Sequence, residues 1–217
     1  MRYPRSGQRE EILKRIFLAT TILFATLILA SCNATPELTM GVRANGTYSN
    51  EFFGFTVTYP AGFHIESRPE AAQRLGVDIA YLSDIDLLST LRTLPLLSAY
   101  QTNPSAVGVG ELNPRMLITA ERVDSGITEA DYLLLLIEQL NYLVDMNFEH
   151  GGVSHTYIAG RQFYTLAVQG TLLHYGSYIF STTDIYHTTR IRGYMVTFAF
   201  FNFDRELMDQ VLNSIEF

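Results

Sequence analysis

Four runs between residues 153 and 202 decide the fold: Val153–Ala159 (VSHTYIA), Gln162–Gln169 (QFYTLAVQ), Tyr175–Thr188 (YGSYIFSTTDIYHT) and Gly193–Asn202 (GYMVTFAFFN). They are rich in tyrosine, phenylalanine, isoleucine and threonine, which favour β-strands. The first two are separated only by Gly160-Arg161, a two-residue turn pattern typical of a β-hairpin. We therefore predict a run of strands that pair in an antiparallel sheet.

Further strands are predicted before this run. Phe53–Tyr59 alternates aromatic or aliphatic residues with glycine and threonine, and Phe63–Ser67 follows after a Pro-Ala-Gly turn as the returning strand. Met116–Val123 shows the same period of two. Arg68–Leu112 is different, because its apolar residues between Ile79 and Leu97 recur at nearly helical spacing. We predict a helical insertion at about 68–112, packed on the same domain.

Two helices are predicted from their caps. Thr128 with Asp131 three residues later forms a capping pattern, and the apolar spacing that follows predicts a helix from Glu129 to about Met146. Asp204 is the cap of a last amphipathic helix, predicted to run through Leu212. The order of elements describes an α+β domain, an antiparallel sheet with helices packed on it.

The beginning of the chain has the three parts of an export signal. A basic leader precedes Ile16–Ala30, an apolar run that would rise only about 22 Å as a helix, against the ~30 Å core of a bilayer. Leu29-Ala30-Ser31-Cys32 then resembles the bacterial lipobox. The resemblance implies cleavage between Ser31 and Cys32, and a diacylglycerol thioether on Cys32 that anchors the protein by its acyl chains on the extracytoplasmic face of the cell membrane. The alternative is an ordinary secretory signal followed by an incidental cysteine.

The cysteine count and the charge exclude a disulfide and argue against nucleic-acid binding. Cys32 is the only cysteine, so an intramolecular disulfide is excluded. Without the leader's five basic and two acidic residues, the formal charge falls from −7 to −10, and the remaining chain contains no lysine. Such an acidic chain without a basic stripe is a poor candidate for binding nucleic acid. We predict three parts: a signal peptide (1–31), a flexible tether (32–46) and one folded domain (47–217).

Short motifs at both ends of this domain are similar to a known family. Tyr48-Ser-Asn50, Phe53-Gly-Phe55, Tyr59-Pro60 and Gly62-Phe63 resemble the opening of PsbP-like domains, and Ile215-Glu-Phe217 resembles their ending. The resemblance covers roughly Thr47 to Phe217. It implies an α/β/α sandwich around a largely antiparallel sheet, and a protein that acts by binding partners. Phe63, where the family often has tryptophan, and the insertion depart from the pattern, so no specific partner is transferred.

Few residues suggest a metal-binding or ligand-binding site. His174 and His187 could approach each other across a hairpin, with Asp184 nearby, and imidazole plus carboxylate is a sensible zinc set. However, residues three apart on a strand point to opposite faces, which works against a site shared by Asp184 and His187. Arg161, Arg190 and Arg192 could form an anion-binding spot, although solvated turn residues are the simpler interpretation. The aromatic pairs Tyr175/Tyr178 and Phe198/Phe200 and the acidic pair Asp84/Asp86 have similarly plain structural interpretations.

The motifs that would identify an enzyme are missing from the sequence. It contains no G-x-S-x-G, H-E-x-x-H or C-x-x-C pattern, and the Gly108/Gly110 pair lacks the rest of a dinucleotide-binding loop. We expect no cofactor and a non-enzymatic binding module whose partner is an envelope protein or another envelope component. Two alternatives stay open. One is an envelope enzyme of an unrecognised kind, which could depend on a metal. The other is a small-ligand carrier, which predicts an apolar cavity between the sheet and the helix that begins at Glu129.

Overall fold

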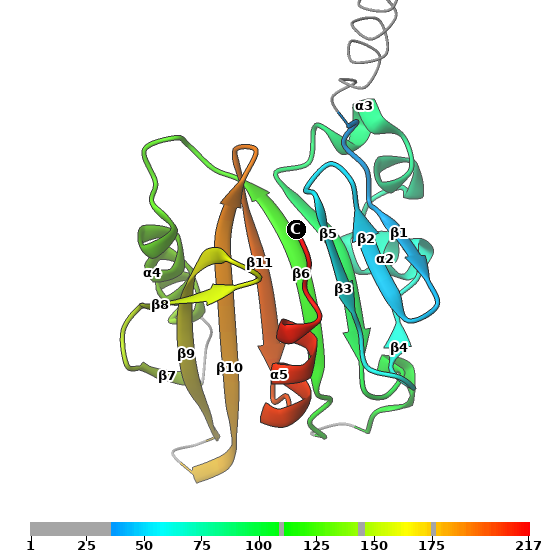
Figure 1. Cartoon of the computed structure of the whole chain (residues 1–217). Helices are drawn as coiled ribbons and strands as arrows, with labels where there is room; N and C mark the ends of the chain where they lie inside the picture. The colour runs from blue at the N-terminus through cyan, green and yellow to red at the C-terminus, as the bar shows by residue number, and fades with distance from the viewer. Residues whose placement is uncertain (1–35, 109–110, 143–145, 175–176) are drawn as a thin grey trace, which may run out of the picture. The chain divides into compact units, whose positions relative to one another are not determined.

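The domain is built on an eight-stranded antiparallel sheet, seen in the computed structural model (Figure 1). The structure describes residues 36–108, 111–142, 146–174 and 177–217. Within them the strands lie in the order β4-β5-β6-β11-β10-β9-β7, and β8 pairs with β9 beside β7. The strands are β4 (His64–Ile65), β5 (Thr93–Tyr100), β6 (Arg115–Arg122), β7 (Met146–His150), β8 (Ser154–Ile158), β9 (Arg161–His174), β10 (Ser177–Ile191) and β11 (Tyr194–Phe201). A second sheet contains β1 (Val42–Ala44), β2 (Thr47–Asn50) and β3 (Phe55–Thr58).

The four strand runs predicted from residues 153–202 are confirmed as β8 to β11. Ala159 and Gly160 have φ of 49° and 77°, so they make the β8–β9 hairpin turn one residue earlier than predicted. β10 and β11 are joined by Arg192 and Gly193, which also have positive φ. Both turns have the left-handed backbone that two-residue hairpins require.

The period of two along the central strands divides the core between the two faces of the large sheet. On β11, Val196, Phe198 and Phe200 face the first side, where they pack with β2, β3, α2 (Arg68–Leu75) and α5 (Arg205–Asn213). Ala199 faces the second side, where it packs with Leu133 of α4 (Glu129–Leu140). Helices therefore cover both faces, and the predicted sandwich around an antiparallel sheet is confirmed (Figure 1).

The helix caps are as the sequence predicts. The Thr128 side chain accepts a hydrogen bond from the Asp131 N–H at 3.1 Å, and the Asp131 carboxylate accepts one from the Thr128 N–H at 3.3 Å. Asp204 caps α5 by accepting from the Leu207 N–H at 2.9 Å. Helix α4 ends at Leu140, earlier than predicted, and Met146–His150 pairs with β9 as strand β7.

The region predicted as a helical insertion has two different halves. Its first half is helical, with α2, the 3-10 turn η1 (Ile79–Leu82) and the short α3 (Ile85–Leu88). The second half contains β5, which lies inside the sheet between β4 and β6, and then the 3-10 turn η2 (Pro104–Ala106). In β5, seven of the eight residues, from Leu94 to Tyr100, are buried. A strand that is buried on both faces does not alternate between apolar and polar residues. The apolar residues of β5 therefore do not show the period of two by which a strand is recognised, and the prediction of a helical insertion is wrong for this half.

The folded unit extends into the segment predicted as a tether. Residues 37–217 form one compact unit, and Met40 is buried in the first core. Val42–Ala44 pairs with β2 through a turn at Asn45 and Gly46, whose φ values of 52° and 78° are left-handed. Cys32 and Ser31 lie outside the described residues. Among the described residues, no helix is long and apolar enough to cross a membrane.

Candidate functional site

A groove of about 630 Å³ lies on the first face of the sheet, between α5 and the strands β8, β9 and β10. It is called the His187 groove below. Helix α5 is fixed at its far end, because Thr58 N–H donates to Ser214 Oγ at 3.0 Å and Thr56 forms a β-bridge with Glu216. The C-terminal segment is therefore docked on β3, and the groove lies on the other side of α5, toward β8–β10.

Both apolar and polar side chains line this groove. The apolar lining consists of Ala167 and Ile158 on the strands, Ile185 on β10, and Phe203, Met208 and Leu212 in and before α5. Hydroxyl groups come from Ser154, Thr156, Thr165 and Thr183. Arg205, Asp209 and Asn213 belong to α5, and Tyr157 of β8 is largely exposed. A concave site of this size with an apolar wall and a few polar groups is typical of small-molecule binding sites.

His187 is the buried polar residue of the groove. It lies on β10 opposite Thr165 of β9, and its Nδ1 is 3.0 Å from Thr165 Oγ1. Its side chain packs edge-on against Phe200, and the residue is only 6% exposed. The other ring nitrogen, Nε2, is buried and has no hydrogen-bond partner. An unpaired buried polar atom costs free energy, so it is uncommon in folded proteins.

Burial also determines the protonation state of this histidine. It lowers the pKa of His187 from 6.5 to about 4, and the negative charge of Asp209 opposes only part of that shift. The imidazole is therefore neutral at pH 7, so one of its ring nitrogens is a donor and the other an acceptor. The nitrogen that Thr165 does not contact is buried and keeps an unused hydrogen-bonding capacity, as donor or acceptor according to the tautomer.

Asp184 lies on the opposite face of the sheet, three residues from His187. It pairs with Val168 and Phe201 on the side covered by α4. Burial raises its pKa to about 6, with partial compensation from the positive charge of Arg115. Asp184 and His187 therefore do not share a metal site, as the strand period predicts.

His174 is also separated from His187, and by a larger distance. The register pairs His187 with Thr165, which is nine residues from His174 along β9, or about 30 Å. The predicted approach of the two histidines across the hairpin is wrong, and the side chain of His174 lies outside what the structure describes. Within the described ranges, no three His, Cys, Asp or Glu side chains are grouped to hold a metal ion.

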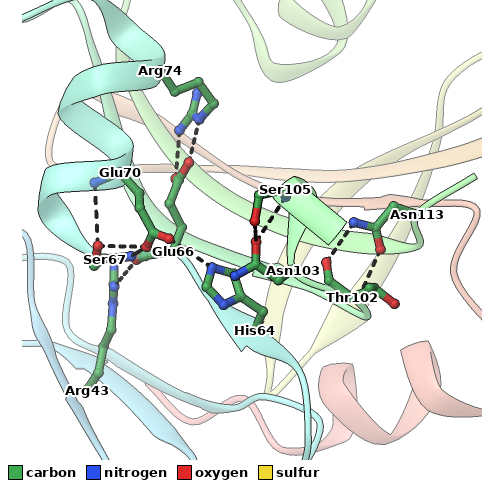
Figure 2. Close-up of polar contacts among 10 residues, drawn as sticks. All are labelled: Arg43, His64, Glu66, Ser67, Glu70, Arg74, Thr102, Asn103, Ser105 and Asn113. Atoms are coloured by element: carbon green, nitrogen blue, oxygen red, sulfur yellow. Dashed lines mark hydrogen bonds and ion pairs between the residues drawn. The ribbon is translucent and has the colours of Figure 1, made fainter. Parts of the chain in front are cut away.

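A second polar group, the Glu66 cluster (His64, Glu66, Ser67, Glu70 and Arg74), joins the sheet edge to α2 (Figure 2). Glu66 is 7% exposed, and its carboxylate accepts bonds from Arg74 Nε at 2.7 Å and Nη2 at 2.9 Å. Burial opposes ionisation of Glu66, but the hydrogen bonds from Arg74 and Ser98 and the charge of Arg74 outweigh it and hold its pKa below the usual range. The carboxylate is therefore ionised and already paired.

The rest of the Glu66 cluster caps α2. Ser67 N–H donates to the Glu70 carboxylate at 2.6 Å, and His64 Nε2 lies 3.2 Å from the other Glu70 oxygen (Figure 2). The guanidinium of Arg43 on β1 donates to the Glu66 carbonyl oxygen. A cavity of about 430 Å³ borders the cluster. Because these groups already satisfy one another, we assign the cluster a structural role: it holds β1, β4 and α2 together.

The Glu66 cluster was missed at the sequence level, although Ser67-x-x-Glu70 is a capping-box spacing that could have revealed its helix. The groove gave no comparable signal, because α5 and β8–β10 are brought together only by the tertiary fold.

The other candidate residues have structural roles. Arg161 and Arg192 lie over the rings of Phe217 and Phe52 at 4.4 Å and 5.2 Å, and Arg190 donates to the Ile127 carbonyl oxygen. These contacts fit the structural interpretation that the sequence favoured over an anion-binding spot.

The aromatic and acidic pairs also have plain structural roles. Phe198 and Phe200 belong to the core, whereas Tyr175 and the side chain of Tyr178 lie outside the described residues. Asp84 caps α3 by accepting from the N–H groups of Asp86 and Leu87.

The described residues between α4 and the sheet pack together, which is evidence against the cavity expected beneath the helix that begins at Glu129. The space between α4 and the sheet is occupied by Leu133, Ile137, Leu166, Val168 and Tyr186, all of which are buried. The described concave site with an apolar wall is instead on the other face, beside α5. A carrier of the kind predicted from the sequence would therefore have to use the His187 groove.

Comparison with solved structures finds proteins with partial structural similarity to this chain. One is the solution structure of cyanobacterial PsbP (CyanoP) from Synechocystis sp. PCC 6803, with a TM-score of 0.49, 16% identity, and coverage of 81% of this chain and 95% of that one. Another is LpqN from Mycobacterium tuberculosis, described as involved in cell envelope biogenesis, with a TM-score of 0.40, 14% identity, and coverage of 75% and 82% of the two chains. No protein-family model and no curated protein matches the sequence.

Proposed function

We propose that this chain is a lipid-anchored extracytoplasmic module of a bacterial cell envelope, and that it binds an envelope component in the His187 groove without catalysing a reaction on it. The location rests on Leu29-Ala30-Ser31-Cys32 at the end of the apolar run. Acyl chains on Cys32 would supply the several hydrophobic attachments that stable anchoring requires. Localisation to the cell membrane follows from the same proposal.

The observation that carries binding is the unpartnered Nε2 of His187 beneath a groove with an apolar wall. The same histidine is a poor catalyst. Thr165 is the hydroxyl group next to it, at 3.0 Å from Nδ1. A general base works best when its pKa is near the operating pH, and burial lowers the pKa of His187 to about 4. His187 is therefore better suited to hydrogen bonding than to taking a proton from Thr165.

The anchor and the binding role are tested together in cells that make the protein. Wild type and Cys32→Ser are compared by membrane fractionation, by mass spectrometry of the N-terminal peptide and by chemical crosslinking. We expect acyl chains on wild-type Cys32, membrane association that the variant loses, and a crosslinked partner that needs the anchor. An unmodified, freely released wild-type protein would refute the anchor, and the protein would then be a secreted domain.

A further inference from the structure

The His187 groove has a wall suited to a hydrocarbon surface. Ile158 and Ile185 contribute from the strands, and Met208 and Leu212 contribute from α5. Methionine adapts to ligands of irregular shape because its side chain is unbranched and polarisable. The groove volume of about 630 Å³ lies within the usual range for small-molecule sites, about 300–1,000 Å³. The occupant that fits this wall is a small molecule with an apolar body.

The charges of the groove indicate that this molecule is neutral. Arg205 and Asp209 are its two charged lining residues, and they lie four positions apart on α5 with opposite signs. His187 is neutral at pH 7 because its pKa is about 4. An anionic ligand would meet Asp209 and a cationic one would meet Arg205, and neither would find a net counter-charge.

One polar group at the groove has an unused hydrogen-bonding capacity. Nε2 of His187 has no hydrogen-bond partner, and His187 is only 6% exposed among the side chains that line the groove. Thr165 holds Nδ1 at 3.0 Å, which fixes the orientation of the ring. A ligand hydroxyl group can serve as donor or acceptor, so it matches either tautomer. Pairing a buried polar atom that is otherwise unsatisfied favours such a ligand over a pure hydrocarbon.

We propose that the His187 groove binds a neutral amphipathic molecule of the fatty-alcohol class, with its apolar chain along α5 and its hydroxyl group bonded to His187. This inference rests on the proposed binding function and names the class of ligand. It makes the protein a carrier or sensor of a small envelope molecule. Partner proteins would then contact other surfaces of the domain.

The test uses the full chain in total cell extracts and a dodecanol that carries a diazirine in its alkyl chain. After illumination, labelled peptides are identified by mass spectrometry, whichever fraction contains the protein, so that a failed anchor does not alter the readout. We expect saturable labelling of residues 154–158 and 205–213. Excess dodecanol should compete at least fivefold better than dodecanoate or dodecylammonium. Labelling confined to peptides outside residues 154–158 and 205–213, or equal competition by the charged analogues, would overturn the proposal.

Matched variants locate the site. Ala167 is an exposed lining residue, so Ala167→Trp fills the groove without disturbing the core, and we expect labelling of the groove peptides to fall at least fivefold. Gln139→Trp adds the same side chain to an exposed position on α4 and should leave labelling unchanged. His187→Phe should weaken labelling, whereas His155→Phe, at an exposed position outside the lining, should not. Labelling that survives Ala167→Trp, or falls equally in Gln139→Trp, would contradict the assignment.

Discussion

Replacing His187 by phenylalanine should change how the stability of this protein depends on pH. The native pKa of His187 is about 4, below the 6.5 of an unperturbed histidine, because the ring is buried. A histidine whose folded pKa is lowered stabilises the fold fully above pH 6.5. That contribution is lost as the pH falls from 6.5 through 4, because the unfolded chain binds the proton first. Phenylalanine keeps an aromatic ring beside Phe200 and cannot titrate.

The size of the effect follows from the two pKa values. The difference between 6.5 and about 4 corresponds to about 3 kcal/mol of stability, most of which is lost between pH 7.5 and pH 4. Wild type should lose this amount and His187→Phe should not. As the pH falls from 7.5 to 4, the free energy of unfolding of the variant should thus rise by about 3 kcal/mol relative to that of wild type. Any repacking cost of the larger ring is the same at every pH and does not affect the slope.

Urea unfolding of the purified proteins, followed by circular dichroism at several pH values, gives this difference directly. His155→Phe provides the control, because it removes an exposed histidine from β8 and should retain the wild-type slope. A His187→Phe difference that stays constant within about 0.5 kcal/mol from pH 7.5 to pH 4 would refute the reasoning, since about 3 kcal/mol is expected. It would mean that His187 is solvated and that the groove is not built as described.

Three further predictions concern groups outside the groove. Burial raises the pKa of Asp184 from 3.8 to about 6, so its ionised form is disfavoured in the fold. Asp184→Asn should therefore stabilise the protein by about 3 kcal/mol at pH 7.5 and lose most of this gain by pH 4. Urea unfolding at both pH values checks this, and a gain that does not change with pH would contradict it. Arg74→Met should lower the free energy of unfolding by about 2 kcal/mol, because the Glu66 carboxylate loses its two hydrogen bonds from Arg74. The double variant Arg74→Met with Glu66→Gln should recover part of that stability, and no recovery would argue against the pair. Thr128→Ala should cost about 1 kcal/mol by removing the cap of α4, whereas Thr128→Ser should cost little; equal losses in thermal unfolding would exclude the hydroxyl as the cause.

The sheet was largely predictable where a strand buries one face, because its apolar residues then alternate with more exposed ones. β6 is the clearest case, because Met116, Ile118 and Ala120 are buried and alternate with half-buried residues. The caps of α4 and α5 were also readable, since Thr128 and Asp204 satisfy N–H groups within their own helices. These signals are local, and the sequence therefore contains them in full.

Strand β5 could not be recognised in this way. It is buried from Leu94 to Tyr100, and Pro95 interrupts its pattern. Proline occurs inside sheets mainly at bulges, and the β5–β6 register does shift between Pro95 and Leu97. The bulge is visible only once β6 is paired with it, so tertiary pairing had to be known first.

The candidate site was less predictable than the fold. His187 was singled out for its chemistry, but the metal partners proposed for it lie elsewhere: Asp184 on the other face and His174 far along β9. What distinguishes His187 is burial combined with an unpaired Nε2 next to α5. Burial and lack of a partner depend on contacts between residues far apart in the sequence, and no local pattern encodes them.

The most direct test of the central claim is a photo-crosslink from the rim of the His187 groove in intact cells. Tyr157 borders the groove and is 68% exposed, and Tyr142, just after α4, is 85% exposed; each is replaced in turn by the photoreactive amino acid p-benzoylphenylalanine. The account predicts a defined adduct from position 157 that disappears with Ala167→Trp, and no such adduct from position 142. The same adducts from both positions, or none from position 157, would contradict the claim that this protein binds through the groove.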